Sequence, residues 1–400
     1  MPTIAERTAH LGTEHAFVVL AEVTKLADAG RDIISFAIGQ PDFITPEHIR
    51  EAAKQAMDAG HTGYTPSAGI PPLRQAVADY LSRTRGLDVS PDEVVVANGA
   101  KPFIMYAILA TTDHGRGHEV LYPNPGFPIY ESQIVANGAV PVALPLLERE
   151  AFAFDLDTLR ARLNGNSRLL ILNSPHNPTG RTLTADELAA IADVLADYPD
   201  VWVFADEIYS QMVHDGRFAS IAAQPGMRER TIIVDGVSKS YAMTGWRLGY
   251  AANPLLAQHF STWITNTDSC ASSIGQWAAV AALTGPQEPH HVMMDSFSRR
   301  RDIIVAGLNR LPGIHCLSPG GAFYVWPNVT ELCHLVGAEN AEALRRRWLH
   351  EADVAVLADR QFGPPVAGEG HHIRFSYATS EENIASGLQR LEDWIGRARR

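Results

Sequence analysis

The sequence predicts an α/β protein with a large domain built on a mostly parallel sheet, followed by a smaller α+β domain. Helical and strand patterns alternate between residue 46 and about residue 290, which favours a sheet covered by helices on both faces. Residues 286–291 end this alternation, and a long helix is expected from about residue 292 to 311. A chain of 400 residues is long enough to bury two such cores.

The expected elements follow in order from the N-terminus. Residues 1–45 form an N-terminal arm with a helix at 16–29, and then a small-domain segment with a strand at 33–36. Residues 46–290 form the large domain, with helices expected at 46–59, 70–85, 102–112, 126–137 and 185–196. Its apolar strands are expected at 94–96, 119–122, 168–172, 201–204, 231–234 and 248–251. Residues 291–400 contain the linking helix and the C-terminal small domain.

The composition is typical of a soluble enzyme. Apolar residues make up 46% of the chain and charged residues 20%. A net charge of −12 offers no broad basic surface for nucleic acid or an anionic membrane. The N-terminus has no apolar signal core, and the longest apolar stretch, 102–110, is about half a membrane span. Since the three cysteines are too scattered for a disulfide framework, a cytoplasmic location is expected.

Lys239 is the most informative residue of the chain. It follows the β-branched strand at 231–234 and lies among small residues, with Arg247 eight positions later. A crowded lysine loses its proton readily and becomes the amine that a Schiff base with an aldehyde cofactor requires. The planar guanidinium of Arg247 can hold a phosphate group of that cofactor. This segment therefore predicts pyridoxal phosphate chemistry.

Polar residues at two other strand ends complete this chemistry. Asp206 and Tyr209 follow the strand at 201–204, and Asn177 follows the strand at 168–172. Ligands of open α/β sheets bind at the carboxyl ends of the strands. Asp206 is the candidate partner of the pyridinium nitrogen, which lets the ring draw electrons from the substrate carbon. Tyr209 and Asn177 are candidate donors to the phenolic oxygen of the cofactor.

A phosphate site is expected where the strand at 94–96 leads into a helix. Gly99, Ala100 and Lys101 lie at this junction, where backbone N–H groups at a helix N-terminus can bind an anion.

These motifs, with the segments 38–43, 63–65 and 373–376, resemble the class I/II aminotransferases of the fold type I pyridoxal phosphate enzymes. The chain looks most similar to the aspartate aminotransferase-like branch, over roughly residues 15–395. The resemblance implies a seven-stranded sheet in the large domain. It also implies that Ser238 and Arg247 complete the phosphate site and that Phe127 stacks on the cofactor ring. Gly236 replaces a phosphate-binding hydroxyl of many relatives, which puts that contact in question.

The resemblance further implies a homodimer with shared active sites, because the residue matching Tyr64 reaches the phosphate of the partner subunit in this family. Arg374, on an expected strand, is the candidate clamp for the substrate α-carboxylate, and Gly39 matches a backbone donor to the same group. Lys101 matches a lysine of acid-specific relatives. Glu14 occupies a place where those relatives carry small hydroxyl residues, and it would favour a cationic substrate if it faced the pocket.

The expected activity is amino-group transfer from an L-α-amino acid to a 2-oxo acid. Two alternatives stay open at this point. A pyridoxal phosphate-dependent oxidase or desaturase acting on a cationic amino acid such as L-arginine would carry the same cofactor residues. A ligand-sensing domain of a regulator is disfavoured, since the resemblance begins near residue 15 and leaves no room for a DNA-binding module. No metal is expected, because no cysteine or carboxylate cluster joins the histidine pairs at 290–291, 371–372 and 114/118 in the sequence.

Overall fold

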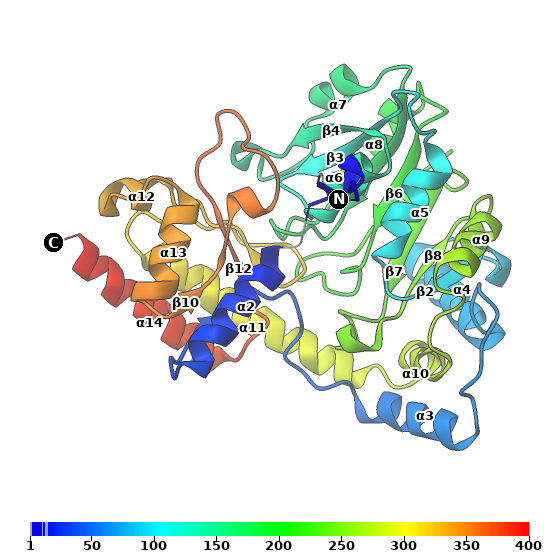
Figure 1. Ribbon diagram of the computed structural model, residues 1–400, viewed down its shortest axis with the longest axis horizontal. Helices are drawn as coiled ribbons and strands as arrows, with labels where there is room; N and C mark the ends of the chain where they lie inside the picture. Colours follow the sequence, from blue (N-terminus) through cyan, green and yellow to red (C-terminus); the bar gives the residue numbers. More distant parts are fainter. Residues whose placement is uncertain (1, 10, 13–14, 400) are drawn as a thin grey trace.

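The computed structural model describes residues 2–9, 11–12 and 15–399. Figure 1 shows two groups of elements: a large sheet with its helices, which we call the large lobe, and a smaller group containing α12, α13, α14 and β12, the small lobe. Helix α11 (Glu288–Arg310) runs between the two. The α/β class with a mostly parallel central sheet is confirmed. The domain boundaries at residues 45 and 290 stay predictions.

Among the described residues, the large sheet has seven strands in the order β2-β8-β7-β6-β5-β3-β4. Strand β8 is antiparallel to its two neighbours, and the other pairs are parallel. The strands are β2 (Val94–Ala97), β3 (Glu119–Asn124), β4 (Val140–Pro145), β5 (Ser167–Asn173), β6 (Trp202–Asp206), β7 (Thr231–Gly236) and β8 (Gly249–Ala252). Because β5, β6 and β7 are parallel neighbours, their carboxyl ends lie along one edge of the sheet.

Strand β4 is absent from the sequence-based expectation. It lies at the end of the strand order beside β3, and most of its residues are only partly buried. It also contains Pro141 and Pro145, which lack the N–H that a central strand needs. Proline is tolerated at a sheet edge. The two prolines interrupt the apolar residues of β4, which made this strand hard to recognise from the sequence pattern.

Helices cover both faces of the large sheet. Leu169 and Phe204 pack with α5, α6 and α9, whereas their chain neighbours Leu170 and Val203 pack with α7 and α8. Strands buried on both faces have this alternation. The helices of the large lobe are α3 (Glu47–Asp58), α4 (Pro71–Arg85), α5 (Pro102–Thr111), α6 (Ile129–Ala136), α7 (Leu156–Arg162), α8 (Ala185–Leu195), α9 (Ala257–Thr267) and α10 (Ser273–Thr284), with 3₁₀ turns at Pro91–Glu93, Glu148–Glu150, Ile221–Ala223 and Thr244–Trp246.

Local signals explain where several of these helices begin and end. Thr184 and Glu187 form a reciprocal capping box at the start of α8. Pro71 occupies the first turn of α4, and Gly86 ends that helix in the left-handed conformation at φ = +67°. No helix in the described ranges has both the length and the apolar character of a membrane span.

The small lobe has its own core. Strands β11 (Leu357–Ala358), β12 (Ile373–Ser376) and β9 (Tyr324–Val325) form one sheet, and β1 (Ile34–Ser35) pairs in parallel with β10 (Val354–Ala355). The remaining helices are α12 (Thr330–Val336), α13 (Ala341–Glu351) and α14 (Glu381–Ala398), with a 3₁₀ turn at Asp359–Gln361. Phe36, Trp348, Phe375 and Trp394 are buried together in this core. The segment around β1 thus packs with C-terminal elements.

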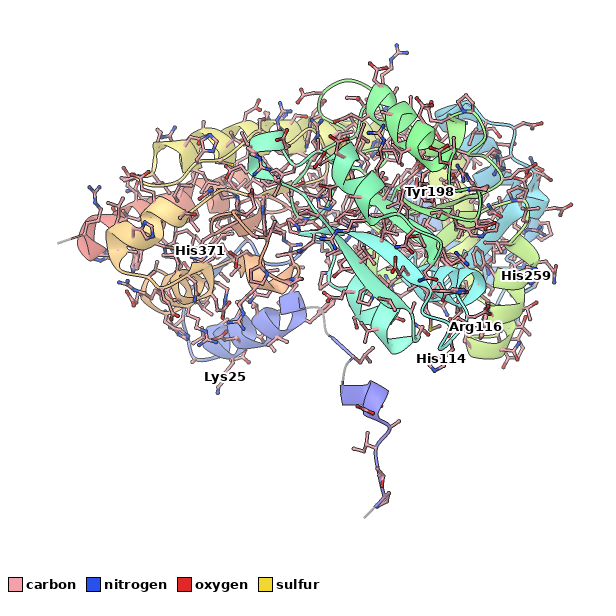
Figure 2. The ribbon with its side chains drawn as sticks, turned by 90° about the horizontal axis from the view of Figure 1, so that it is seen from above. Lys25, His114, Arg116, Tyr198, His259 and His371 are labelled. Atoms are coloured by element: carbon pink, nitrogen blue, oxygen red, sulfur yellow. The ribbon has the colours of Figure 1, made fainter. Side chains whose placement is uncertain are left out.

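The N-terminal arm consists of α1 (Glu6–Ala9) and α2 (His15–Asp28). Helix α2 packs on the small lobe through Ala16, Val19 and Val23. Figure 2 shows α1 standing away from the body of the molecule. Glu14 lies outside the described residues, so its predicted role is untouched by the structure.

Candidate active site

A cavity of about 530 Å³ lies at the carboxyl ends of β5, β6 and β7. It brings together most of the residues predicted from the sequence: Gly39, Ala100, Lys101, Phe127, Asn177, Asp206, Tyr209, Ser238, Lys239, Arg247 and Arg374. These residues come from seven separate stretches of the chain, and Arg374 is contributed by β12 of the small lobe. The arrangement matches the usual position of a ligand site in an open α/β sheet.

Asp206 is buried at the end of β6 and is held by Tyr130. The Tyr130 hydroxyl donates a hydrogen bond of 2.6 Å to Asp206 Oδ2, and the backbone N–H of Ile208 approaches Oδ1 at 3.4 Å. Burial raises the pKa of the Asp206 carboxyl to about 6, although the bond from Tyr130 lowers it. A carboxylate in this environment gains from a cationic partner, because burial disfavours its charged form when it stands alone.

Lys239 follows β7 and points into the same cavity. Its Nζ donates a hydrogen bond of 2.5 Å to the carbonyl oxygen of Gly39. The ammonium also lies 5.9 Å from the ring centre of Tyr209 and 5.8 Å from that of Phe323. Aromatic faces at this distance stabilise a cation. The Lys239 amine therefore lines the cavity, where it contacts Gly39, Tyr209 and Phe323.

The predicted phosphate site is a tight crossing of two backbone segments. Gly99 has φ = +92°, and a Cβ on it would be 2.3 Å from Arg247 Nη2. A Cβ on Gly249 would be 2.3 Å from the backbone nitrogen of Ala100. Arg247 donates to the carbonyl oxygens of Thr244 (2.9 Å) and Asn98 (3.3 Å). The guanidinium is thereby fixed beside the backbone N–H groups that precede α5.

A side chain at Gly236 would be crowded by the neighbouring backbone. A Cβ at this position would be 3.0 Å from Gly249 Cα and 3.0 Å from the carbonyl oxygen of Leu248. Thr244 and Gly245 line the cavity instead, close to Ser238.

Arg374 lies on β12 with its guanidinium wedged between polar and aromatic groups. It donates to Asn177 Oδ1 at 2.9 Å and to the carbonyl oxygen of Ala37 at 2.6 Å, and it lies 4.4 Å from the ring centre of Tyr324. Asn177 is positioned in turn by Asn173, whose Oδ1 accepts from the Asn177 backbone N–H at 2.9 Å. With its Oδ1 engaged by Arg374, the Asn177 amide group keeps its NH₂ available as a donor.

Two predicted residues differ from the rest in position. Tyr64 does not line the cavity and is 93% exposed. Gly99 shapes the cavity wall through its contact with Arg247 and does not face the cavity itself. Phe127 lines the cavity, with Lys101 Nζ 5.3 Å from its ring centre, and its stacking on a cofactor ring stays a prediction.

Sequence reasoning missed Tyr130, Asn173 and Tyr324, which all line the cavity. Asn173 ends β5, directly after the strand predicted at residues 168–172, so its strand-end position was a usable signal. Tyr130 lies inside α6 and Tyr324 at the start of β9, and neither has a local pattern that separates it from a core tyrosine.

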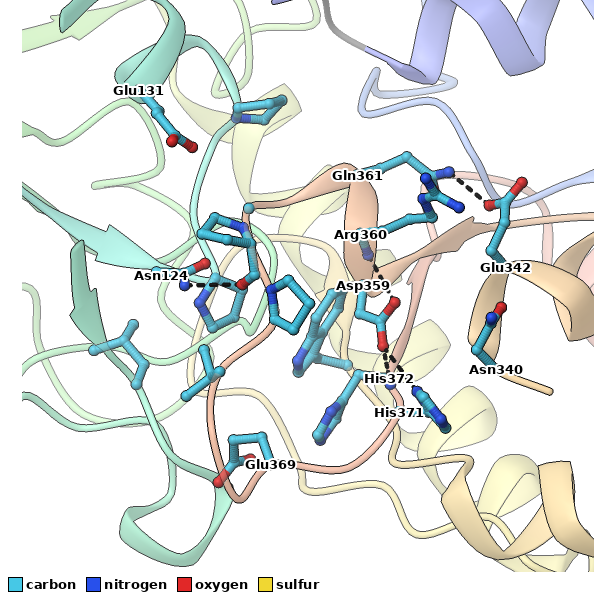
Figure 3. Close-up of a pocket in the computed structure, with 18 of the residues that line it drawn as sticks. Asn124, Glu131, Asn340, Glu342, Asp359, Arg360, Gln361, Glu369, His371 and His372 are labelled. Carbon is cyan, nitrogen blue, oxygen red and sulfur yellow. Dashed lines mark hydrogen bonds and ion pairs between the residues drawn. The ribbon is translucent and has the colours of Figure 1, made fainter. Parts of the chain in front are cut away.

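A second cavity, of about 890 Å³, lies between the lobes (Figure 3). It contains the pair His371 and His372, and the structure corrects the expectation that no carboxylates join these histidines. Among the described residues, Glu148, Glu369 and His372 form a group whose side chains lie close enough together to bind a metal ion. Glu148 already accepts from His315 at 3.0 Å and from Asn328 at 2.6 Å, and lies 3.3 Å from His372 Nε2. The group is therefore a hydrogen-bonded contact between the β4 loop and the small lobe.

Comparison with known proteins places this geometry in a family. The aminotransferase class I and II family matches residues 31–391. An aspartate aminotransferase of Geobacillus stearothermophilus is 37% identical over 395 residues, covering 98% of each chain. An aspartate/prephenate aminotransferase of Cereibacter sphaeroides is 37% identical over 400 residues, again covering 98% of each.

Solved structures agree in fold over the whole chain. The aspartate aminotransferase of Rhizobium meliloti superposes with a TM-score of 0.92 at 34% identity, covering 99% of this chain and 100% of that one. The enzyme of Thermus thermophilus with maleate gives a TM-score of 0.91 at 34% identity, covering 98% and 100%. These names support amino-group transfer and give no support to the oxidase alternative. The chain therefore belongs to the aminotransferase class I and II family, whose members are pyridoxal phosphate-dependent enzymes acting on amino acids and 2-oxo acids.

Proposed function

We propose that this aminotransferase binds pyridoxal phosphate in the cavity around Lys239 and uses a dicarboxylic amino acid such as aspartate as its amino donor. The observation that carries the proposal is the convergence of a lysine amine, a buried carboxylate and a buried guanidinium on one cavity of about 530 Å³. The names of the relatives support the substrate class.

The residues present fit the cofactor. Asp206 offers a buried carboxylate for the ring nitrogen, and Lys239 offers an amine for the aldehyde. Because Gly99 and Gly249 have no side chains, their backbone segments and Arg247 approach one another closely. The backbone N–H groups before α5 and the Arg247 guanidinium can then bind the phosphate. When bound, pyridoxal phosphate supplies an electron-withdrawing ring that stabilises negative charge on the substrate Cα.

Each protein group then has a distinct task. The Lys239 amine would take the proton from the substrate Cα, and in the reverse half of the exchange it would give a proton to the Cα of the new amino acid. Asp206 would stay ionised and would stabilise a positive charge at the ring nitrogen. Tyr209 and the Asn177 NH₂ would donate to the phenolic oxygen, and Phe127 would contact the ring. Arg374, stacked on Tyr324, binds the substrate α-carboxylate through parallel hydrogen bonds, with the Gly39 backbone beside it.

Lys101 sets the preference for a second carboxylate. Its ammonium lies over Phe127 at the rim of the cavity, where it can meet the distal group of a bound dicarboxylate. The only cationic partner for the α-carboxylate in this scheme is Arg374, so the two ends of the substrate are bound by two different cations. Glu14, which would favour a cationic side chain, lies outside the described residues.

A homodimer completes the site in this proposal. Several residues on or near the cavity are exposed in the single chain, among them Lys101, Gly245 and Arg247. The exposed fraction is 80% for Ile44 and 93% for Tyr64. A second copy covering this side would bury these groups and bring its own Tyr64 to the phosphate. The cytoplasmic location stays a prediction.

The proposal is tested with purified protein and pyridoxal phosphate. Aspartate, glutamate and arginine are each mixed with 2-oxoglutarate or oxaloacetate, while the new amino acid and dissolved oxygen are measured together. Transfer from aspartate without oxygen uptake is the expected result. Turnover of arginine with oxygen uptake and without an amino acceptor would contradict it.

A further inference from the structure

Two buried tyrosines from different lobes meet at the edge of the active-site cavity. The hydroxyl of Tyr324, on β9 of the small lobe, lies 2.8 Å from the hydroxyl of Tyr209, which follows β6 of the large lobe. Their rings are nearly perpendicular, at 84°, with centres 5.7 Å apart. Tyr324 is 1% exposed and Tyr209 4%. Their hydroxyl contact is thus shielded from bulk water.

Backbone pairing between the lobes fixes the position of Tyr324. The backbone N–H of Ala322 donates to the carbonyl oxygen of Met212 at 2.7 Å, and the backbone N–H of His214 donates to the carbonyl oxygen of Gly320 at 2.8 Å. Val213 and Gly321 form an antiparallel bridge between the same two segments. The segment that leads into Tyr324 is therefore tied to the segment that follows Tyr209. The backbone of the two tyrosines is thereby held in place, which brings their side chains close enough for the hydroxyls to meet.

The Tyr324 hydroxyl is also packed against the backbone of Gly39. A Cβ on Gly39 would lie 2.2 Å from this oxygen. The opposite part of the Tyr324 ring is covered by the Arg374 guanidinium, 4.4 Å from the ring centre. The tyrosine therefore contacts the predicted carboxylate clamp through its ring and Tyr209 through its hydroxyl.

Each tyrosine hydroxyl has one proton, and this decides which of the two donates the hydrogen bond between Tyr209 and Tyr324. Either hydroxyl can donate when the two are alone. Burial raises the pKa of the Tyr209 phenol well above its ordinary value, and the neighbouring Tyr324 raises it as well. Tyr209 therefore keeps its single proton. If Tyr209 gives that proton to the phenolic oxygen of the cofactor, the bond between the two tyrosines requires Tyr324 as the donor. A donor to Tyr209 polarises its O–H and makes it a stronger donor in turn.

We propose that Tyr324 is a positioning residue, which donates a hydrogen bond to Tyr209 and thereby strengthens the Tyr209 hydrogen bond to the phenolic oxygen of pyridoxal phosphate. This inference rests on the proposed function of the cavity. Strengthening this bond stabilises the deprotonated form of the bound chromophore, in which the phenolic oxygen carries more negative charge. Tyr324 therefore lowers the pH at which the chromophore loses its proton and increases cofactor affinity.

The direct test is Tyr324→Phe, which keeps the ring under Arg374 and removes only the hydroxyl. The visible absorbance of the cofactor-loaded protein is titrated with pH, and the dissociation constant of pyridoxal phosphate is measured on the stripped protein. The transition is expected to move to higher pH, and the dissociation constant is expected to rise about two- to tenfold, as for the loss of one hydrogen bond.

Tyr106→Phe is the matched control. Tyr106 is a fully buried tyrosine whose hydroxyl lies 2.7 Å from Thr267 Oγ1 and does not line the cavity. Its loss should lower thermal stability to a similar extent while leaving both the spectroscopic transition and cofactor affinity unchanged. Equal shifts in the two variants would show a general loosening of the protein and would overturn the proposal.

A double-mutant cycle separates a relay through Tyr209 from a direct effect. In a Tyr209→Phe background, Tyr324→Phe is expected to move the transition by much less than in the unmodified protein. The same shift in both backgrounds, or no shift in either, contradicts the relay. Failure of the unmodified protein to gain visible absorbance with pyridoxal phosphate would instead contradict the proposed function.

Discussion

The hydroxyl of Tyr130 donates a hydrogen bond of 2.6 Å to Asp206 Oδ2, and both residues are buried at the end of the large sheet. This bond lowers the pKa of Asp206, which burial raises to about 6. The ionised carboxylate is the form that can pair with a protonated ring nitrogen. Tyr130 therefore keeps Asp206 charged over a wider pH range than burial alone would permit.

Tyr130→Phe should weaken cofactor binding, and the loss should grow as the pH falls. Without the hydroxyl the pKa of Asp206 rises further above its ordinary value, so less of it is ionised near pH 6. We expect the dissociation constant of pyridoxal phosphate to rise about three- to tenfold at pH 6 and little at pH 8. Tyr106→Phe, which loses a bond to Thr267 outside the cavity, is the control. An equal loss at both pH values would argue against this account of Tyr130.

Arg374→Lys should raise KM for amino acids more than it lowers kcat. Lysine keeps the positive charge but lacks the planar fork that binds a carboxylate through two bonds. The loss of one charged hydrogen bond corresponds to an increase in KM of about ten- to a hundredfold. Arg345→Lys, in the small-lobe pair with Glu342, should leave steady-state kinetics unchanged. A normal KM in Arg374→Lys would remove Arg374 from the carboxylate site.

Lys101→Met tests the preference for a dicarboxylic substrate. It should lower kcat/KM for aspartate about tenfold or more and change kcat/KM for alanine less. Only aspartate has a side-chain carboxylate that would lose its contact with the Lys101 ammonium. Lys25→Met is the control, because Lys25 points away from the body of the protein in Figure 2. Uniform loss across all amino acids would indicate that Lys101 serves the cofactor and not the substrate side chain.

Glu148→Gln should reduce stability at neutral pH but not in strong acid. Burial raises the pKa of Glu148, but hydrogen bonds from His372, Asn328 and His315 outweigh this and lower it to about 2. A carboxyl whose pKa is lower in the folded state stabilises the protein above its unfolded pKa of about 4.5, and the contribution is lost as pH falls towards 2. It amounts to at most about 3 kcal/mol at pH 7.

The measurement is the free energy of unfolding of both proteins between pH 3 and pH 7. The difference in the free energy of unfolding is expected to stay constant down to about pH 5 and to narrow below it, as the pH passes the unfolded pKa of about 4.5. Glu150→Gln, at an exposed neighbouring position, should show little effect at any pH. A difference that stays constant down to pH 3 would mean that Glu148 acts by packing and not by its charge.

Strand-end positions were predictable from the sequence. Asp206, Asn177 and Lys239 each follow an apolar run, and parallel strands bring such positions to one edge without any knowledge of side-chain contacts. Local sequence patterns also predicted the long helix α11 and the strand β12 that carries Arg374. These features depend on periodicity within a few residues.

Contacts between distant segments were not predictable. Tyr130 and Asp206 are 76 residues apart, Tyr209 and Tyr324 are 115 apart, and Glu148 and His372 are 224 apart. Each pair forms only when α6, β9 or the β4 loop packs against another element. A single tyrosine or glutamate has no periodicity that would reveal its partner.

The attachment of pyridoxal phosphate to Lys239 is the central claim, and the chain allows a sharp measurement of it. The sequence contains four lysines, Lys25, Lys54, Lys101 and Lys239, of which Lys101 and Lys239 line the cavity. The loaded protein is reduced with borohydride, digested and analysed by mass spectrometry. A pyridoxyl group on the Lys239 peptide, retained in Lys101→Met and lost in Lys239→Ala together with turnover, is the predicted result. A label on any other lysine, or turnover by Lys239→Ala, would contradict the account.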